Sequence, residues 1–225
     1  SAGVATTTSF GTDLAWIGMM LVHPEFRRRG IGTELMRRCV ENLERKGIRC
    51  IKLDASDGGK PVYERLDFQA EYKVQRWERE GDGSSINGFS TDNEFLDFDL
   101  DTRTFGADRS RLLCSFAKRS RIVTRLSSSN TLAGYGMIRP GDRAAYVGPI
   151  VACDSGTGVS VAAELIERET AKLFWDIPLV CHEAVSRAES SGFRGVRSLT
   201  RMWRGADLVV GQPQLQFGIG DLATG

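Results

Sequence analysis

The sequence predicts an α/β protein with a mixed sheet, built from two copies of a similar domain. Two observations predict this class. In the first half, an apolar stretch over residues 14–22, an amphipathic stretch over 31–46 and a second apolar stretch over 48–53 have the pattern of a strand, a helix and a strand. The same order of patterns returns about 126 residues later in the second half. A strand, helix and strand in this order form a right-handed parallel crossover.

The first half begins with two predicted strands. Residues 3–10 are rich in Thr and Val, and the turn at residues 11–13 leads into the long apolar strand over 14–22. The helix that follows carries apolar residues at helical spacing along one face and ends at Gly47. Pro61 opens a short helix to about residue 66, and a strand is predicted near residues 71–77.

The loop before the central helix has the composition of an anion-binding site. Arg27, Arg28 and Arg29 precede two glycines, Gly30 and Gly32, which have no Cβ to hold a ligand away from the backbone. The first-turn amides of a helix lack partners within the helix and carry partial positive charge. The sequence therefore predicts a phosphate site at the start of this helix.

This stretch resembles motif A of the GNAT superfamily of acyl-CoA-dependent N-acyltransferases. The motif is Arg or Gln, two residues, Gly, one residue, then Gly or Ala, and Arg27, Gly30 and Gly32 match it. The resemblance implies that the loop cradles the pyrophosphate of acetyl-CoA and that the preceding strand pairs its backbone with the pantetheine arm. The implied binding residues are Met20, Leu21, Val22, Arg27, Arg28, Arg29, Gly30, Ile31, Gly32 and Thr33.

A second segment, residues 63–68, resembles a later signature of the same superfamily, a Tyr five residues before a Phe that usually follows a Gly. Tyr63 and Phe68 match it, whereas Asp67 stands in place of the Gly. The resemblance implies that Tyr63 is the general acid that protonates the departing thiolate, which a phenol can do. The alternative is that Tyr63 is a half-buried packing residue on a short helix.

The motifs do not identify a general base. The strand over residues 16–22 contains no carboxylate, and Asp13 at its beginning is the nearest candidate. An Asp at that place is also a common turn-forming residue. Asp99, Asp101, Asp176 and His182 in the second half are further candidates.

Composition argues against several classes of function. Thirty basic residues against 29 acidic ones give a net charge of +1, which is untypical of a nucleic-acid-binding protein. No apolar run approaches the ~20 residues of a membrane span and no signal peptide is evident, so we expect a cytoplasmic protein without a membrane partner. The five cysteines fit reduced thiols, and the two histidines lack ligand spacing, so no metal site is expected.

The second half resembles the C-terminal domain of certain tandem GNAT proteins, and we expect it to be degenerate. The glycine pair returns 126 residues later, at positions 156 and 158. The offset of 126 places Cys153 where the first arginine stands, and an offset of 125, which also aligns Phe68 with Phe193, places Ala188 where the tyrosine stands. Asp154 would repel a pyrophosphate. The predicted limits are a GNAT domain at 1–80, a linker at 81–93 and a second, degenerate GNAT-like domain at 94–225.

The first copy has only 29 residues before Gly30. Its resemblance to the GNAT superfamily implies that it lacks the N-terminal elements that usually form one wall of the acceptor groove. Either the natural protein has a further N-terminal part, which we favour, or the second domain covers the exposed edge. The predicted function is an N-acetyltransferase that moves an acetyl group from acetyl-CoA to a primary amine of a small molecule or peptide, by direct attack in a ternary complex. A homodimer is left open. The alternatives are a non-catalytic acyl-CoA sensor or interaction scaffold, and a phosphate-binding protein of another fold, although the nucleotide-binding glycine motifs are missing from the sequence.

Overall fold

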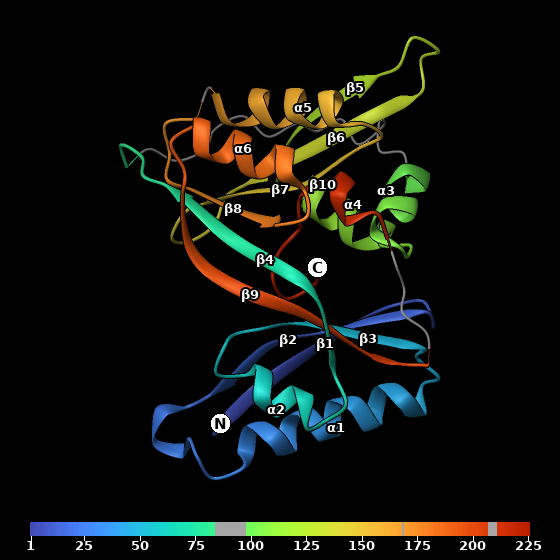
Figure 1. Ribbon diagram of the computed structural model, residues 1–225, viewed down its shortest axis with the longest axis vertical. Helices are drawn as coiled ribbons and strands as arrows, with labels where there is room; N and C mark the ends of the chain where they lie inside the picture. Colours follow the sequence, from blue (N-terminus) through green and yellow to red (C-terminus); the bar gives the residue numbers. More distant parts are fainter. Residues whose placement is uncertain (84–97, 168, 207–210) are drawn as a thin grey trace. The chain divides into compact units, whose positions relative to one another are not determined.

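The computed structural model describes residues 1–83, 98–167, 169–206 and 211–225. The chain divides into two compact units (Figure 1). Unit 1 contains Ser1–Tyr72, Leu199–Val209 and Leu222–Gly225, and unit 2 contains Lys73–Ser198 and Val210–Asp221. The domain limits drawn from the sequence stay a prediction, and most of the predicted linker, from residue 84 to residue 93, lies outside the described residues.

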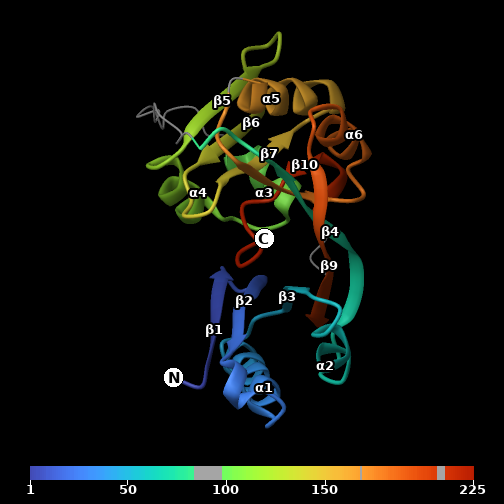
Figure 2. The same ribbon diagram turned by 90° about the vertical axis from the view of Figure 1, so that its left-hand side faces the viewer.

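Unit 1 is a sheet with two helices, α1 and α2, on the same side (Figures 1 and 2). Its strands follow the order β1-β2-β3-β9-β4, with β1 antiparallel to β2 and β2 parallel to β3. The apolar stripe of α1, which includes Met36 and Val40, packs against the same face of β2 and β3 as Tyr63 of α2. The elements are β1 (Gly3–Phe10), β2 (Leu14–Val22), η1 (Pro24–Phe26), α1 (Ile31–Arg45), β3 (Cys50–Ala55), α2 (Lys60–Glu64), β4 (Gln69–Arg79) and β9 (Arg194–Gly205).

The strands β2 and β3 are neighbours only at their beginnings. Their parallel pairing runs from Leu14 opposite Cys50 to Trp16 opposite Lys52, and both strands continue beyond it. The register between β1 and β2 also shifts near Met19, which has a φ of 50°, so β2 carries a bulge there. The two strands therefore diverge, and the second half of β2 has no strand partner on its β3 side among the described residues.

Unit 2 has helices on both faces of its sheet (Figure 2). Helices α5 and α6 pack on one face and α3 and α4 on the other, and the strand order is β4-β8-β7-β6-β5 with β10 beside β7. The strands β7 and β8 are again parallel neighbours only at their beginnings, over Ala145 to Val147. The elements are α3 (Phe98–Phe105), α4 (Ser110–Ala117), β5 (Arg121–Leu126), β6 (Leu132–Arg139), β7 (Ala145–Ala152), α5 (Ser155–Glu167), β8 (Leu173–Pro178), α6 (His182–Ser190), η2 (Pro213–Leu215) and β10 (Gln216–Gly218).

The strand that follows the short helix of each repeat, β4 after α2 and β9 after α6, is paired with a strand of the other repeat. In unit 1, residues 200–205 of β9 pair with β3, and in unit 2, residues 74–79 of β4 pair with β8. The strand, helix, strand order predicted for both halves is confirmed. The sequence analysis missed α3, and it missed β10, whose three residues are too short to show a periodicity.

Two further findings bear on the expectations from composition. All five cysteines are free. None of the helices in the part of the chain that the structure describes is long and apolar enough to cross a membrane.

Candidate active site

A cavity of about 470 Å³ opens in unit 1 between the end of β2, the start of α1 and the loop that leads into α2. It lies where β2 has diverged from β3. Phe26, Gly58, Gly59 and Val62 line it together with Tyr63, the predicted general acid. Nine of the ten predicted binding residues also line it: Met20, Leu21, Val22, Arg27, Arg28, Gly30, Ile31, Gly32 and Thr33.

The start of α1 forms one end of this cavity. Gly30 has a φ of 78° at the N-cap, a conformation that favours glycine, and no side chain caps the helix. A Cβ on Gly32 would meet only a methyl group of Val22, at 3.6 Å, so the space beside the first turn is open. The first-turn amides therefore face a region that an anion can enter.

The three arginines of the loop have different surroundings. Arg27 donates from Nε to the carbonyl oxygen of Val22 at 3.1 Å, so it ties the loop to the end of β2. Arg28 lines the cavity and has a φ of 60°. The guanidinium of Arg29 lies 5.6 Å from the ring centroid of Phe26, and Arg29 is not among the described residues that line the cavity. Arg28 is thus the arginine of the three best placed to meet a phosphate.

Tyr63 lies on α2 at another part of the cavity wall. It is half-buried, and its ring centroid is 6.2 Å from that of Phe68. A Cβ on Gly59 would come within 3.0 Å of the Tyr63 ring, so the absence of a side chain at 59 lets the ring lie against the loop. Burial raises the pKa of the Tyr63 phenol, which keeps its proton on the oxygen at neutral pH.

The structure does not bring Asp13 to this cavity. Asp13 lies in the turn before β2, seven residues from Met20, which is about 23 Å along a strand. Its exposed carboxylate is 3.4 Å from Nη1 of Arg49. No acidic side chain lines the cavity among the described residues. This placement does not support Asp13 as a general base.

Two of the other acidic candidates are buried within unit 2. Arg109 binds both carboxylate oxygens of Asp101, at 2.8 and 2.9 Å, and Tyr135 donates to the same carboxylate. Arg76 binds both oxygens of Asp176, at 2.8 and 2.7 Å. These carboxylates are engaged in ion pairs and are not available as bases in this arrangement.

The corresponding place in unit 2 is filled by the chain itself. The strand β10 pairs with β7 at Ile150 and Val151, beyond the last pair of β7 with β8. The carbonyl oxygen of Phe217 accepts from Nε1 of Trp175 at 2.8 Å, and the amide of Ile219 donates to the carbonyl of Asp176 at 2.9 Å. Because Trp175 and Asp176 belong to β8, β10 lies between the two diverging strands.

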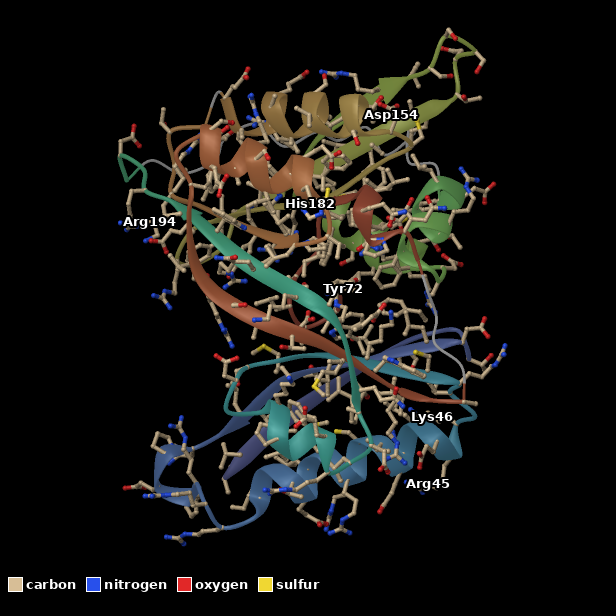
Figure 3. All side chains as sticks on the ribbon, viewed as in Figure 1. Arg45, Lys46, Tyr72, Asp154, His182 and Arg194 are labelled. Atoms are coloured by element: carbon tan, nitrogen blue, oxygen red, sulfur yellow. The ribbon has the colours of Figure 1, made fainter. Side chains whose placement is uncertain are left out.

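The start of α5 also differs from the start of α1. Only two residues, Cys153 and Asp154, separate β7 from α5, whereas eight residues, 23–30, separate β2 from α1. The Asp154 carboxylate accepts from the amide of Thr157 at 2.9 Å and from its hydroxyl at 2.7 Å. The hydrogen bond from the Thr157 amide contributes most to lowering the pKa of Asp154, and the bond from the Thr157 hydroxyl lowers it further. Asp154 lies at the start of α5 (Figure 3). Unit 2 therefore lacks the arginine-glycine loop, and a negative charge caps its helix.

The sequence analysis missed four residues of the cavity wall. Phe26 is the last residue of η1, Gly58 and Gly59 belong to the loop after β3, and Val62 lies on α2. The paired glycines were a usable signal, because a loop that follows the second strand of a parallel crossover returns to the same edge of the sheet. Among the described residues, no cluster of three or more His, Cys, Asp or Glu side chains is suited to hold a metal ion.

Comparison with known proteins bears directly on this geometry. A family model described as "Acetyltransferase (GNAT) domain" matches residues 98–218, and a second model with the same description matches residues 2–70. The chain belongs to the GNAT acetyltransferase family. The mixed α/β fold with two GNAT domains, predicted from the sequence, is thereby confirmed.

Three known proteins illustrate the similarity. The uncharacterized N-acetyltransferase YitH of Bacillus subtilis is 25% identical over 180 residues, which cover 73% of this chain and 61% of that protein. A crystal structure from Pyrococcus horikoshii, named as a candidate acetyltransferase, has a TM-score of 0.81 and 27% identity over all of this chain and 76% of its own. A tandem GNAT protein from the clavulanic acid biosynthesis pathway shares the fold, with a TM-score of 0.57 and 16% identity over 92% of this chain and 80% of its own.

Proposed function

We propose that this GNAT protein uses acetyl-CoA as acyl donor and acetylates a primary amine of a small molecule or peptide. One observation carries the proposal. One cavity in unit 1 combines an uncapped helix start, the end of β2 beyond its last pair with β3, and the phenol of Tyr63. These are the groups needed for a phosphate, a pantetheine arm and a leaving thiolate, respectively.

The residues of the cavity suit the parts of acetyl-CoA. The first-turn amides of α1 and the guanidinium of Arg28 would hold the pyrophosphate. The backbone of residues 20–22 would pair with the amides of the pantetheine arm, because β3 leaves that edge of β2 open. Gly58, Gly59 and Val62 would form the opposite, largely apolar wall.

Acetyl-CoA supplies an activated thioester when it is bound. A neutral acceptor amine forms a carbon–nitrogen bond at the thioester carbonyl while the carbon–sulfur bond breaks. Tyr63 holds the proton on its phenol oxygen and donates it to the departing sulfur. The amine gives up its own proton to solvent, and solvent returns a proton to the Tyr63 phenolate. We assign no residue as the general base, because no acidic side chain of the described lining faces the cavity.

The same lining favours one alternative, a protein that binds acyl-CoA as a sensor and does not turn it over. Without a base in the cavity, an amine that arrives protonated would stay unreactive. The two functions share the binding step and differ only in the release of CoA thiol. The homodimer left open by the sequence stays a prediction.

The test is a calorimetric titration of acetyl-CoA into the wild-type chain and into an Arg27→Ala, Gly32→Glu double variant. We expect micromolar binding by the wild type and none by the variant. An acceptor screen read by thiol release would then separate the enzyme from the sensor. If the wild type fails to bind acetyl-CoA, the proposed function is wrong for both.

A further inference from the structure

Arg201 of β9 contacts side chains on β2, β3 and β4 near the point where β2 and β3 diverge. Its Nε and Nη2 donate to the two carboxylate oxygens of Asp54 on β3, at 2.9 and 3.0 Å. Its Nη1 donates to the hydroxyl of Tyr72 on β4 at 2.8 Å (Tyr72 in Figure 3). The guanidinium carbon lies 4.4 Å from the ring centroid of Trp16 on β2. One side chain thus contacts residues of three strands, β2, β3 and β4.

This cluster contains a buried ion pair. The side chains of Arg201 and Asp54 are 2% and 0% exposed. Burial opposes the charge on Arg201, but the Asp54 carboxylate more than offsets it and holds the pKa of Arg201 above its ordinary value. A buried bidentate pair has one well-defined geometry, and removal of one partner leaves an uncompensated charge. The strands that the pair joins are therefore held in a fixed arrangement.

The position of the cluster relates it to the cavity. Trp16 forms the last parallel pair between β2 and β3, opposite Lys52, and Asp54 lies two residues further along β3. Four residues after Trp16, β2 reaches the cavity wall at Met20, and four residues after Asp54, the chain reaches it at Gly58. Both walls of the cavity thus start from strands that Arg201 holds.

We propose that Arg201, which belongs to the second repeat, is a positioning residue for the acyl-CoA cavity of the first repeat. It sets the angle at which β2 and β3 diverge, and so the width of the space for the pantetheine arm. The three guanidinium nitrogen atoms of Arg201 donate to Asp54 and Tyr72, and the guanidinium lies beside the ring of Trp16. Arg201 therefore acts on the cavity through these three residues. This proposal rests on the proposed function of the cavity.

Unit 2 provides a matched control. Arg76 of β4 binds Asp176 of β8 in the same bidentate manner, at 2.8 and 2.7 Å, and the two are register partners as Arg201 and Asp54 are. The backbone carbonyl of Asp176 accepts from the amide of Ile219, the residue that directly follows β10. Loss of the Arg76 pair should therefore weaken unit 2 without changing the cavity of unit 1.

The experiment compares Arg201→Lys with Arg76→Lys, which keep the charge and lose the planar bidentate geometry. Acetyl-CoA affinity is measured by calorimetry, and backbone opening by hydrogen exchange of residues 17–22. We expect Arg201→Lys to raise the Kd about tenfold and to accelerate exchange in these residues, and Arg76→Lys to leave both within about twofold of wild type. An unchanged Kd for Arg201→Lys, or an equal rise for Arg76→Lys, would overturn the proposal.

Tyr72→Phe provides a milder variant in case Arg201→Lys does not fold. It removes one hydrogen bond of Arg201 and leaves the Asp54 pair in place. We expect a Kd rise of about two- to threefold and faster exchange in residues 17–22, and wild-type values for both would count against the proposal. A wild-type chain that binds no acetyl-CoA would refute the proposed function, whereas the exchange measurement would still test the role of Arg201.

Discussion

The first and second repeats contain the same divergence of two parallel strands and use it in opposite ways. In unit 1, β2 and β3 separate after three paired residues, and a cavity of about 470 Å³ opens beside the separated end of β2. In unit 2, β7 and β8 separate after three paired residues, and β10 enters between them with Phe217 fully buried. The divergence is thus a property of the shared fold, and the neighbouring segments decide whether a ligand can use it.

The loops before the two helices show the same contrast. Gly30 leaves the start of α1 uncapped, whereas the Asp154 carboxylate caps α5. An anion would gain from the amides of α1, but at α5 it would have to displace a carboxylate and would meet its negative charge. A single acyl-CoA site per chain follows from the proposed function, with the second repeat supplying a strand and Arg201.

The largest expected effect is on the filled space of unit 2. Phe217→Ala removes a fully buried ring that packs against Gly158 and should destabilise unit 2 by about 3–5 kcal/mol. Urea denaturation measures this change. Acetyl-CoA stoichiometry, measured by calorimetry, should remain one per chain, because the arginine-glycine loop is missing from unit 2. Binding of a second equivalent would show that β10 alone had closed the second site.

The next effect concerns the uncapped helix. Gly32→Glu places a carboxylate where the pyrophosphate would bind and should weaken acetyl-CoA binding at least about a hundredfold. The matched control is Gly156→Glu at the second position of α5, which should leave the affinity within about twofold of wild type. Equal losses in the two variants would mean that the helix starts do not differ as the structure indicates.

The third effect separates binding from chemistry in the open cavity. Tyr63→Phe should lower kcat about a hundredfold and leave the Kd for acetyl-CoA nearly unchanged, because only the proton donor is lost. Burial raises the Tyr63 pKa, so wild-type activity should persist to alkaline pH and fall only above the ordinary value near 10. A thiol-release assay across pH measures both. Unchanged kcat in the variant would assign Tyr63 to packing.

Most of the open cavity was predictable because its signals are local in sequence. The arginines, the glycines and the apolar strand before them lie within 20 residues of one another, and the structure gathers nine of ten predicted residues at one cavity. Asp13 was a different kind of prediction, because it was chosen only for its position next to β2 in the sequence. Seven residues of extended chain separate Asp13 from Met20 at the cavity, a distance of about 23 Å.

The features that set the second repeat apart were harder to predict. Phe217 belongs to β10 and lies 66 residues after Val151 of β7, the strand with which β10 pairs. A strand of three residues has no recognisable pattern in the sequence. The partner of Asp54 is 147 residues away, on a strand that pairs with the other repeat. These contacts form because β9 of the second repeat pairs with β3 of the first, and β4 of the first repeat pairs with β8 of the second. The sequence of one repeat alone does not show this exchange of strand partners.

The smallest expected effect tests the one departure from the family signature. Asp67 has a φ of 61°, whereas the matching residue of the second repeat, Gly192, has a φ of 80° and adopts it without a Cβ. Asp67→Gly should relieve this strain, lose only an exposed ion pair with Arg204 at 3.5 Å, and stabilise unit 1 by about 0.5–1 kcal/mol. Urea denaturation measures the change, and acetyl-CoA affinity should not move. A loss of stability would mean that the ion pair, together with the greater freedom of glycine in the unfolded chain, outweighs the strain, and that the first repeat has an energetic reason to keep Asp where the second keeps Gly.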